Sequence, residues 1–167
     1  MGQSQSTLPI SPNVYSNPNS GQYLTKFSPD LSTLELYTQF GNGDGEIDIS
    51  PSAFLVDYCG NVYVSGWGAR INPLGTPLNN MPISSNSFQS DNGDGFNFYL
   101  IVLSRDFENL LYGSYIGGAN AREHVDGGTS RFDKNGVVYQ SVCGGCGGFS
   151  DFPTTPGVIS DTNLSSN

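Results

Sequence analysis

The apolar and polar positions of this chain alternate in short runs, and no stretch places apolar residues at the helical spacing of 3.6. The most regular run covers residues 33–40, where Leu34, Leu36, Thr38 and Phe40 fall on one face. The intervening positions fall on the other face, because successive side chains of a strand point to opposite sides. We therefore predict a strand with one buried face in this run.

Further patterns predict other strands and the turns between them. Residues 98–103 are apolar at every position, as in a strand that is covered on both faces. Asn135-Gly136 before an apolar run is a strong signal for a two-residue hairpin turn. Ser-x-Asp at 28–30 and 104–106 marks a second kind of hairpin. In the first part of the chain we predict four short strands, near residues 22–28, 33–40, 52–57 and 61–67.

Much of the chain repeats itself. The stretches 8–15, 81–88 and 152–159 each begin with an apolar residue and Pro, followed within two residues by a hydroxyl-bearing side chain. Their spacings are 73 (81 − 8) and 71 (152 − 81) residues. Such Pro-rich marks fall in connections, because proline cannot sit in a central strand.

The segments between these marks also align. Residues 23–31 match 99–107, and 57–63 match 133–139, both at an offset of 76 (99 − 23 and 133 − 57). A fixed period of this kind indicates a repeat architecture. We divide the chain into an N-terminal tail (1–7), a first repeat (8–80), a second repeat (81–151), and the start of a third repeat or a C-terminal tail (152–167).

A four-stranded antiparallel unit that recurs every seventy-odd residues describes a blade of a β-propeller. The predicted fold is therefore all-β, made of four-stranded antiparallel blade-like repeats, with a β-sandwich of two sheets as the alternative. A closed propeller needs at least about four blades, and two would leave sheet edges open to pairing. We accordingly expect that the chain is a piece of a longer protein or associates with copies of itself.

Composition and charge narrow the range of partners. The chain has 167 residues, of which 36% are hydrophobic, so it is long and apolar enough for a core. Six basic and fifteen acidic residues give a net charge of −9, which disfavours nucleic acid and anionic membranes as partners. No apolar run approaches the length of a membrane span, so no membrane insertion is expected.

Three motifs together resemble a known family. They are Asp-x-x-Gly-Asn-Val-Tyr-Val-Ser-Gly at 57–66, Leu-Leu-Tyr-Gly-Ser-Tyr-Ile-Gly-Gly at 110–118 and Asp-Phe-Pro-Thr-Thr-Pro-Gly at 151–157. They resemble SBBP-type β-propeller repeats. The run Val-Tyr-Gln-Ser-Val-Cys-Gly-Gly-Cys-Gly-Gly at 138–148 is similar to Bacteroidetes cell-surface proteins of the gliding-motility-associated and PKD-domain type.

The resemblance implies secretion through the type IX system and display at the cell surface. It implies a non-catalytic structural or adhesive role, associated with gliding or adhesion, in which the partners are other blades of the parent protein or further copies of the chain. The alternative is a module that binds a surface glycan or a protein through exposed aromatic side chains. A fold resemblance does not by itself establish either function.

Cys143 and Cys146 form a Cys-x-x-Cys motif with three interpretations. A redox pair needs a helix after the first Cys, but a strand-like run precedes the motif and a Gly-rich loop follows it. A structural zinc site needs four ligands, which here would have to be this pair with Cys59 and His124. We predict instead a local Cys143–Cys146 disulfide formed outside the cell, where thiols oxidise. Whether Cys59 is free or paired stays open.

Two Asn-Gly-Asp-Gly stretches, at 42–45 and 92–95, suggest calcium as a cofactor, because oxygen-rich Gly loops suit hard cations. Neither fits the EF-hand loop, and their spacing of 50 (92 − 42) differs from the repeat period. Plain turns also explain such clusters. If calcium binds, the best ligands are Asp44, Glu46, Asp48, Asp91 and Asp94.

Two further residues invite functional interpretations. His124, the single histidine, lies among acidic residues, but the chain lacks the Gly-x-Ser-x-Gly pattern of a nucleophile elbow, and we predict no catalytic residue. Trp67 stands between two glycines at the end of a predicted strand. It could stack on a sugar or a protein partner, or it could pack between the repeats.

Overall fold

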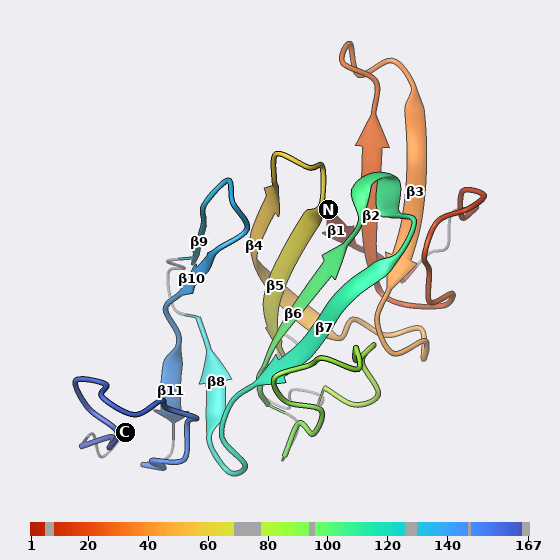
Figure 1. Cartoon of the computed structure of the whole chain (residues 1–167). Coiled ribbons are helices and arrows are strands. Elements are labelled where there is room, and N and C mark those ends of the chain that lie inside the picture. Colours follow the sequence, from red (N-terminus) through yellow and green to blue (C-terminus); the bar gives the residue numbers. More distant parts are fainter. Residues whose placement is uncertain (6–8, 69–77, 94–95, 126–129, 147, 165–167) are drawn as a thin grey trace.

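The computed structural model describes residues 1–5, 9–68, 78–93, 96–125, 130–146 and 148–164 (Figure 1). In these residues the regular structure is β, apart from one turn of 3₁₀ helix, η1 (Arg105–Phe107). The strands are β1 (Gly2–Gln3), β2 (Gln22–Phe27), β3 (Leu34–Phe40), β4 (Ile49–Val56), β5 (Val62–Gly68), β6 (Phe98–Leu103), β7 (Leu110–Ile116), β8 (Arg122–His124), β9 (Ser130–Phe132), β10 (Val138–Gln140) and β11 (Cys143–Cys146). No described helix is long and apolar enough to cross a lipid bilayer.

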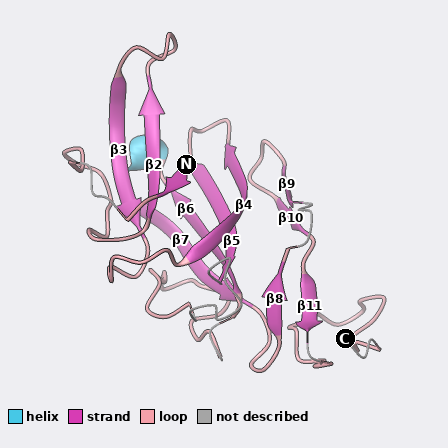
Figure 2. Ribbon diagram, turned by 180° about the vertical axis from the view of Figure 1, so that it is seen from behind, coloured by secondary structure: helices cyan, strands magenta, loops and turns pink. Residues whose placement is uncertain are grey.

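A four-stranded antiparallel sheet in the order β4-β5-β6-β7 stands at the centre of the molecule (Figures 1 and 2). Alternate residues of β5 serve its two faces. Val62 and Val64 join the main hydrophobic core, whereas Tyr63 and Trp67 face the other way, toward β9 and β8. Strand β6 is apolar on both sides and mostly buried, which confirms the prediction for residues 98–103.

Smaller antiparallel sheets flank the central sheet on both sides. The sheet β1-β2-β3 packs on one face, where Leu24 and Phe40 share the core with Val64 and Ile101. The pairs β8–β11 and β9–β10 lie beside the other face (Figures 1 and 2). Main-chain pairing holds each sheet together, and buried apolar side chains hold neighbouring sheets against one another.

This architecture confirms the all-β class and the antiparallel sheets, but it changes how the strands are grouped. The four strands of one predicted repeat do not form one sheet, because β4 and β5 pair onward with β6 and β7 of the next repeat. The described residues contain no closed propeller, and the packed sheets fit the β-sandwich alternative. Residues 2–3, which the sequence placed in a tail, form β1 against Gln22 and Tyr23.

The offset of 76 residues recurs in the geometry of the strands and turns. Ser28 and Ser104 each accept the backbone amide of the residue five positions on, Thr33 at 3.0 Å and Asn109 at 2.9 Å. Each serine also donates its own amide back to that residue's carbonyl, at 2.9 and 2.8 Å. The two hairpins, β2–β3 and β6–β7, are thus closed by the same turn.

The other hairpin recurs in the same way. Asp57 and Asp133 each accept the amide of the residue four positions on, Asn61 at 2.9 Å and Val137 at 3.0 Å. The return bonds run from the aspartate amide to that residue's carbonyl, at 3.0 and 2.9 Å. The β9–β10 hairpin predicted from Asn-Gly is therefore confirmed, and it repeats the β4–β5 hairpin.

The Pro-rich marks explain why β3 differs from its prediction. Tyr37 and Gln39, expected on a solvent face, are buried because residues 11–17 run alongside β3. Ser11 accepts the amide of Tyr37 at 2.9 Å, and in the next repeat Ser84 accepts the amide of Gly113 at 3.1 Å. Each mark therefore covers the outer side of a strand.

Candidate functional site

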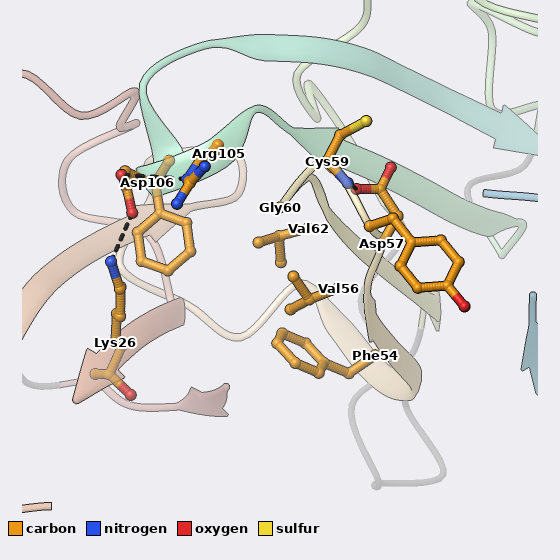
Figure 3. Close-up of a pocket in the computed structure, with 12 residues that line it drawn as sticks. Lys26, Phe54, Val56, Asp57, Cys59, Gly60, Val62, Arg105 and Asp106 are labelled. Atoms are coloured by element: carbon orange, nitrogen blue, oxygen red, sulfur yellow. Dashed lines mark hydrogen bonds and ion pairs between the residues drawn. The ribbon is translucent and has the colours of Figure 1, made fainter. Parts of the chain in front are cut away.

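A cleft of about 370 Å³ opens between β2 and the hairpin that joins β4 to β5 (Figure 3). We call it the hairpin cleft. Its apolar residues come from β4, β5 and η1, and its polar residues come from β2 and the two turns at its rim. The apolar members are Phe54, Val56, Val62 and Phe107, and the polar ones include Thr25, Lys26, Asp57, Arg105 and Asp106.

The apolar part of the cleft is open to solvent. Phe54 and Val56 are each 48% exposed at the end of β4, although alternate residues of a strand that is covered on both faces are normally buried. Val62 and Phe107, deeper in the cleft, are buried and belong to the core. The cleft therefore presents an apolar surface that this chain leaves uncovered.

The charged groups at the rim are held mainly by one ion pair. Lys26 Nζ lies 2.7 Å from Asp106 Oδ1 and 3.4 Å from Glu35 Oε2. The hydrogen bond from Lys26 lowers the pKa of Asp106, and the same bond raises the pKa of Lys26. Arg105 packs its side chain over Gly60 and is largely exposed. These groups orient the rim, and their exposure keeps the gain in stability small.

Local backbone geometry places the rim residues. Asp106 and Phe107 have φ values of 57° and 62°, in the left-handed region that residues other than glycine rarely adopt. Leu31, the repeat equivalent of Phe107, has the same conformation, with φ of 60°. On the opposite rim, Asp57 accepts the amide of Cys59 at 2.8 Å and so fixes the tip of the β4–β5 hairpin.

The predicted cysteine sites are separated by the fold. Cys143 lies opposite His124 in the β11–β8 pairing. Cys59 is exposed at the tip of the β4–β5 hairpin, at the other end of β5 from Trp67, which contacts His124. These ends are roughly 15–20 Å apart for a strand of this length. The side chain of Cys146 lies outside the described residues, so the Cys143–Cys146 disulfide stays a prediction.

The predicted calcium ligands lie in two loops. Among the described residues, no three His, Cys, Asp or Glu side chains are grouped so that they could hold a metal ion. Asp44 accepts the amide of Glu46 at 2.8 Å, and Asp91 accepts the amide of Gly93 at 3.0 Å, as in ordinary Asx turns. Asp94 lies outside the described residues. The turn interpretation of both loops therefore has direct support, and the calcium site stays a prediction.

Trp67 lies between sheets rather than on an open surface. It is half-buried, and its ring meets that of His124 edge-on, with centroids 6.0 Å apart. This position agrees with packing between the repeats, the second interpretation of this residue. The most exposed aromatic side chain near the hairpin cleft is Tyr58, over which Lys134 Nζ lies 5.4 Å from the ring centroid.

The sequence analysis considered Asp48 as a calcium ligand and missed that it is a buried carboxylate. Burial raises its pKa to about 7, although the amide of Asn42, which it accepts at 3.0 Å, acts in the opposite direction. The Gln22 amide, in the orientation that satisfies both its atoms, donates to Asp48 Oδ2 at 2.9 Å. A side chain at Gly41 would collide with the same carboxylate.

A similar arrangement recurs in the second repeat. Glu123 is buried and accepts the amide of Gly118 at 3.1 Å, and a side chain at Gly117 would collide with its carboxylate and with Asn97. Gly41 and Gly117 are 76 residues apart (117 − 41), which is the signal that sequence reasoning could have used. The buried acids are thus part of the repeat and have a structural role.

The hairpin cleft itself was not predicted, and only the exposed apolar residues near the Asp57 turn could have indicated it. Its chemistry suits an apolar, strand-like partner, because an exposed apolar wall lies beside the free part of strand β2. Comparison of the chain with protein-family models, with curated proteins and with solved structures finds no match.

Proposed function

We propose that the chain is a non-catalytic structural or adhesive segment of a secreted bacterial surface protein, built from β-propeller-type repeats. The observation that carries the proposal is the recurrence of the same turns and strand pairings at one offset of 76 residues. Such repetition serves an extended scaffold, in which each unit packs against its neighbours.

The surface of the chain supports a place outside the cell. Its net charge of −9 keeps a scaffold well solvated, and its polarity comes mostly from uncharged side chains, since charged residues are only 13% of the chain. Display at the cell surface rests on the resemblance to secreted Bacteroidetes proteins and on this composition.

The proposal is tested on intact cells of the organism that encodes the chain. Brief treatment with a protease that cannot enter the cell should release peptides from exposed turns, such as 28–33 and 104–109. A cytoplasmic protein in the same cells is the control and should stay whole. Peptides that are released only after lysis would contradict surface display.

A binding role for exposed aromatics is the second candidate, and the structure favours Tyr58 over Trp67 for it. Tyr58 is exposed at the tip of the β4–β5 hairpin, whereas Trp67 is packed against His124. On a glycan array, binding that is lost with Tyr58→Ala and kept with the exposed control Phe88→Ala would support this role. Equal binding by both variants and the wild type would exclude Tyr58.

A further inference from the structure

The hairpin cleft is best understood from a contact that the chain makes elsewhere. Tyr63, on β5, packs against the β9–β10 hairpin, with its ring 5.9 Å from that of Phe132. Its hydroxyl lies over Gly136, where an added Cβ would be only 2.4 Å away. At the hairpin tips, the amide of Tyr58 donates to the carbonyl of Lys134 at 3.4 Å. One hairpin of the Asp-turn type thus holds a tyrosine of the hairpin before it.

The walls of the hairpin cleft repeat this surface. Subtracting 76 from Phe132 and Gly136 gives Val56 and Gly60, and both of these residues line the cleft. The residue that corresponds to Tyr63 is Tyr139 (63 + 76), and it is 59% exposed on β10. The chain therefore has one unused tyrosine and one unused surface of the kind that receives it.

The strand edge beside the cleft leads to the same partner. In the central sheet, β5 pairs with β6 so that Val62 faces Leu103 and Val64 faces Ile101. Shifting both strands by the repeat offset aligns β10 (Val138–Gln140) with residues 25–27 of β2. Those residues pair with β3 on one side, and β1 pairs with β2 only at Gln22 and Tyr23. The part of the edge that β10 would need is the part that β1 leaves open.

Exposed apolar side chains show that the sheet of β2 and β3 is prepared for a further neighbour. Phe27 and Leu31 are 48% and 75% exposed. Their repeat equivalents, Leu103 and Phe107, are 1% and 5% exposed because the β2–β3 sheet covers them. Large apolar groups at matching positions are thus buried where a neighbouring sheet exists and open where it does not.

We propose that the hairpin cleft receives the β9–β10 hairpin of a second copy of this chain, so that β10 extends the sheet at β2 and Tyr139 packs on Val56. The two half-sheets would then form a sheet equivalent to β4-β5-β6-β7. The contact is head-to-tail, because each copy offers one hairpin and one cleft, and such a contact continues until a ring closes or a filament grows. This inference rests on the repeat geometry behind the proposed function and is independent of where the protein resides.

Two charge variants test the proposal with purified full-length chain. Tyr139→Glu alters the hairpin and Val56→Glu alters the cleft, and both side chains are exposed enough to be replaced without loss of the fold. Phe88→Glu, at a side chain that is 62% exposed elsewhere, is the matched control. Circular dichroism and melting temperature confirm that each variant is folded, and analytical ultracentrifugation measures the mass as a function of concentration.

The wild type and the control should associate with concentration, and each variant should weaken association at least about tenfold. An equimolar mixture of the two variants should form a dimer and nothing larger, because only the intact hairpin of one and the intact cleft of the other can meet. Hydrogen exchange at residues 25–27 should slow when the wild type associates.

Three outcomes would overturn the proposal. A wild type that stays monomeric up to about 1 mM, where even weak contacts form, removes the second copy as the occupant. Association that both variants retain places the contact elsewhere. Variants that are monomeric both alone and in mixture rule out a head-to-tail contact. None of these outcomes bears on surface display, which the protease experiment tests separately.

Discussion

Replacing the buried acid Asp48 with asparagine should stabilise the protein, and the gain should grow with pH. Asp48 is almost inaccessible to solvent, and burial raises its pKa from the ordinary 3.8 to about 7. The folded state therefore holds a proton that the unfolded chain releases near pH 4. The contribution of Asp48 to stability is greatest below that pH and is lost as the pH rises to about 7.

The expected size follows from the same pKa. One pKa unit corresponds to about 1.4 kcal/mol, so a rise from 3.8 to about 7 amounts to about 2–4 kcal/mol once water near the loop is allowed for. Asparagine keeps an oxygen that can accept the amide of Asn42 and the Gln22 donor, and it carries no charge. The free energy of unfolding of Asp48→Asn should match the wild type near pH 4 and exceed it by this amount at pH 8.

Urea denaturation of both proteins in the same buffers, from pH 4 to pH 8, measures this difference. Other carboxylates also titrate in this range, but they are shared by the two proteins and cancel in the comparison. A difference that is constant across the range would refute the reasoning, because it would show that the Asp48 carboxylate carries no burial penalty. Loss of stability at pH 8 would refute it more directly.

Three further predictions concern other parts of the fold. Burial acts to raise the pKa of Asp57, but hydrogen bonds from Asn61 outweigh it and the pKa is lowered, so Asp57→Asn should destabilise the fold more at pH 7 than at pH 3 in the same denaturation assay. Gly113→Ala should cost about 1–3 kcal/mol, because its Cβ would lie 2.2 Å from a backbone carbonyl; thermal unfolding beside Gly157→Ala, where nothing lies within 4 Å, provides the comparison. Alkylation without reductant should modify only Cys59, as judged by intact mass, and three modified thiols would exclude a Cys143–Cys146 disulfide.

The strands and hairpins were predictable from the sequence because their signals are local. Asn135-Gly136 closes a hairpin by its own backbone preferences, and the apolar run at 98–103 marks a strand buried on both faces wherever it pairs. The grouping of strands into sheets was not predictable in the same way. It depends on the pairing of β5 with β6, whose residues are far apart in the chain.

The candidate site shows the same division. Asp48 was correctly singled out as an unusual carboxylate loop residue, but its burial depends on Gln22, which comes from another strand. Val56 has an ordinary strand pattern, and its exposure results from the absence of a covering hairpin. Sequence periodicity reports which faces are apolar and does not report whether a neighbour covers them.

The offset between the repeat and the sheet has a consequence for how such a chain can grow. A cut between residues 80 and 81, at the boundary of the sequence repeat, would divide the central sheet, whereas a piece covering residues 49–116 keeps all four of its strands. Duplicating a unit of 76 residues anywhere in the array adds one whole sheet and still leaves one half-sheet at each end. Arrays of different length can therefore evolve by gain or loss of single units without changing the surfaces at their ends.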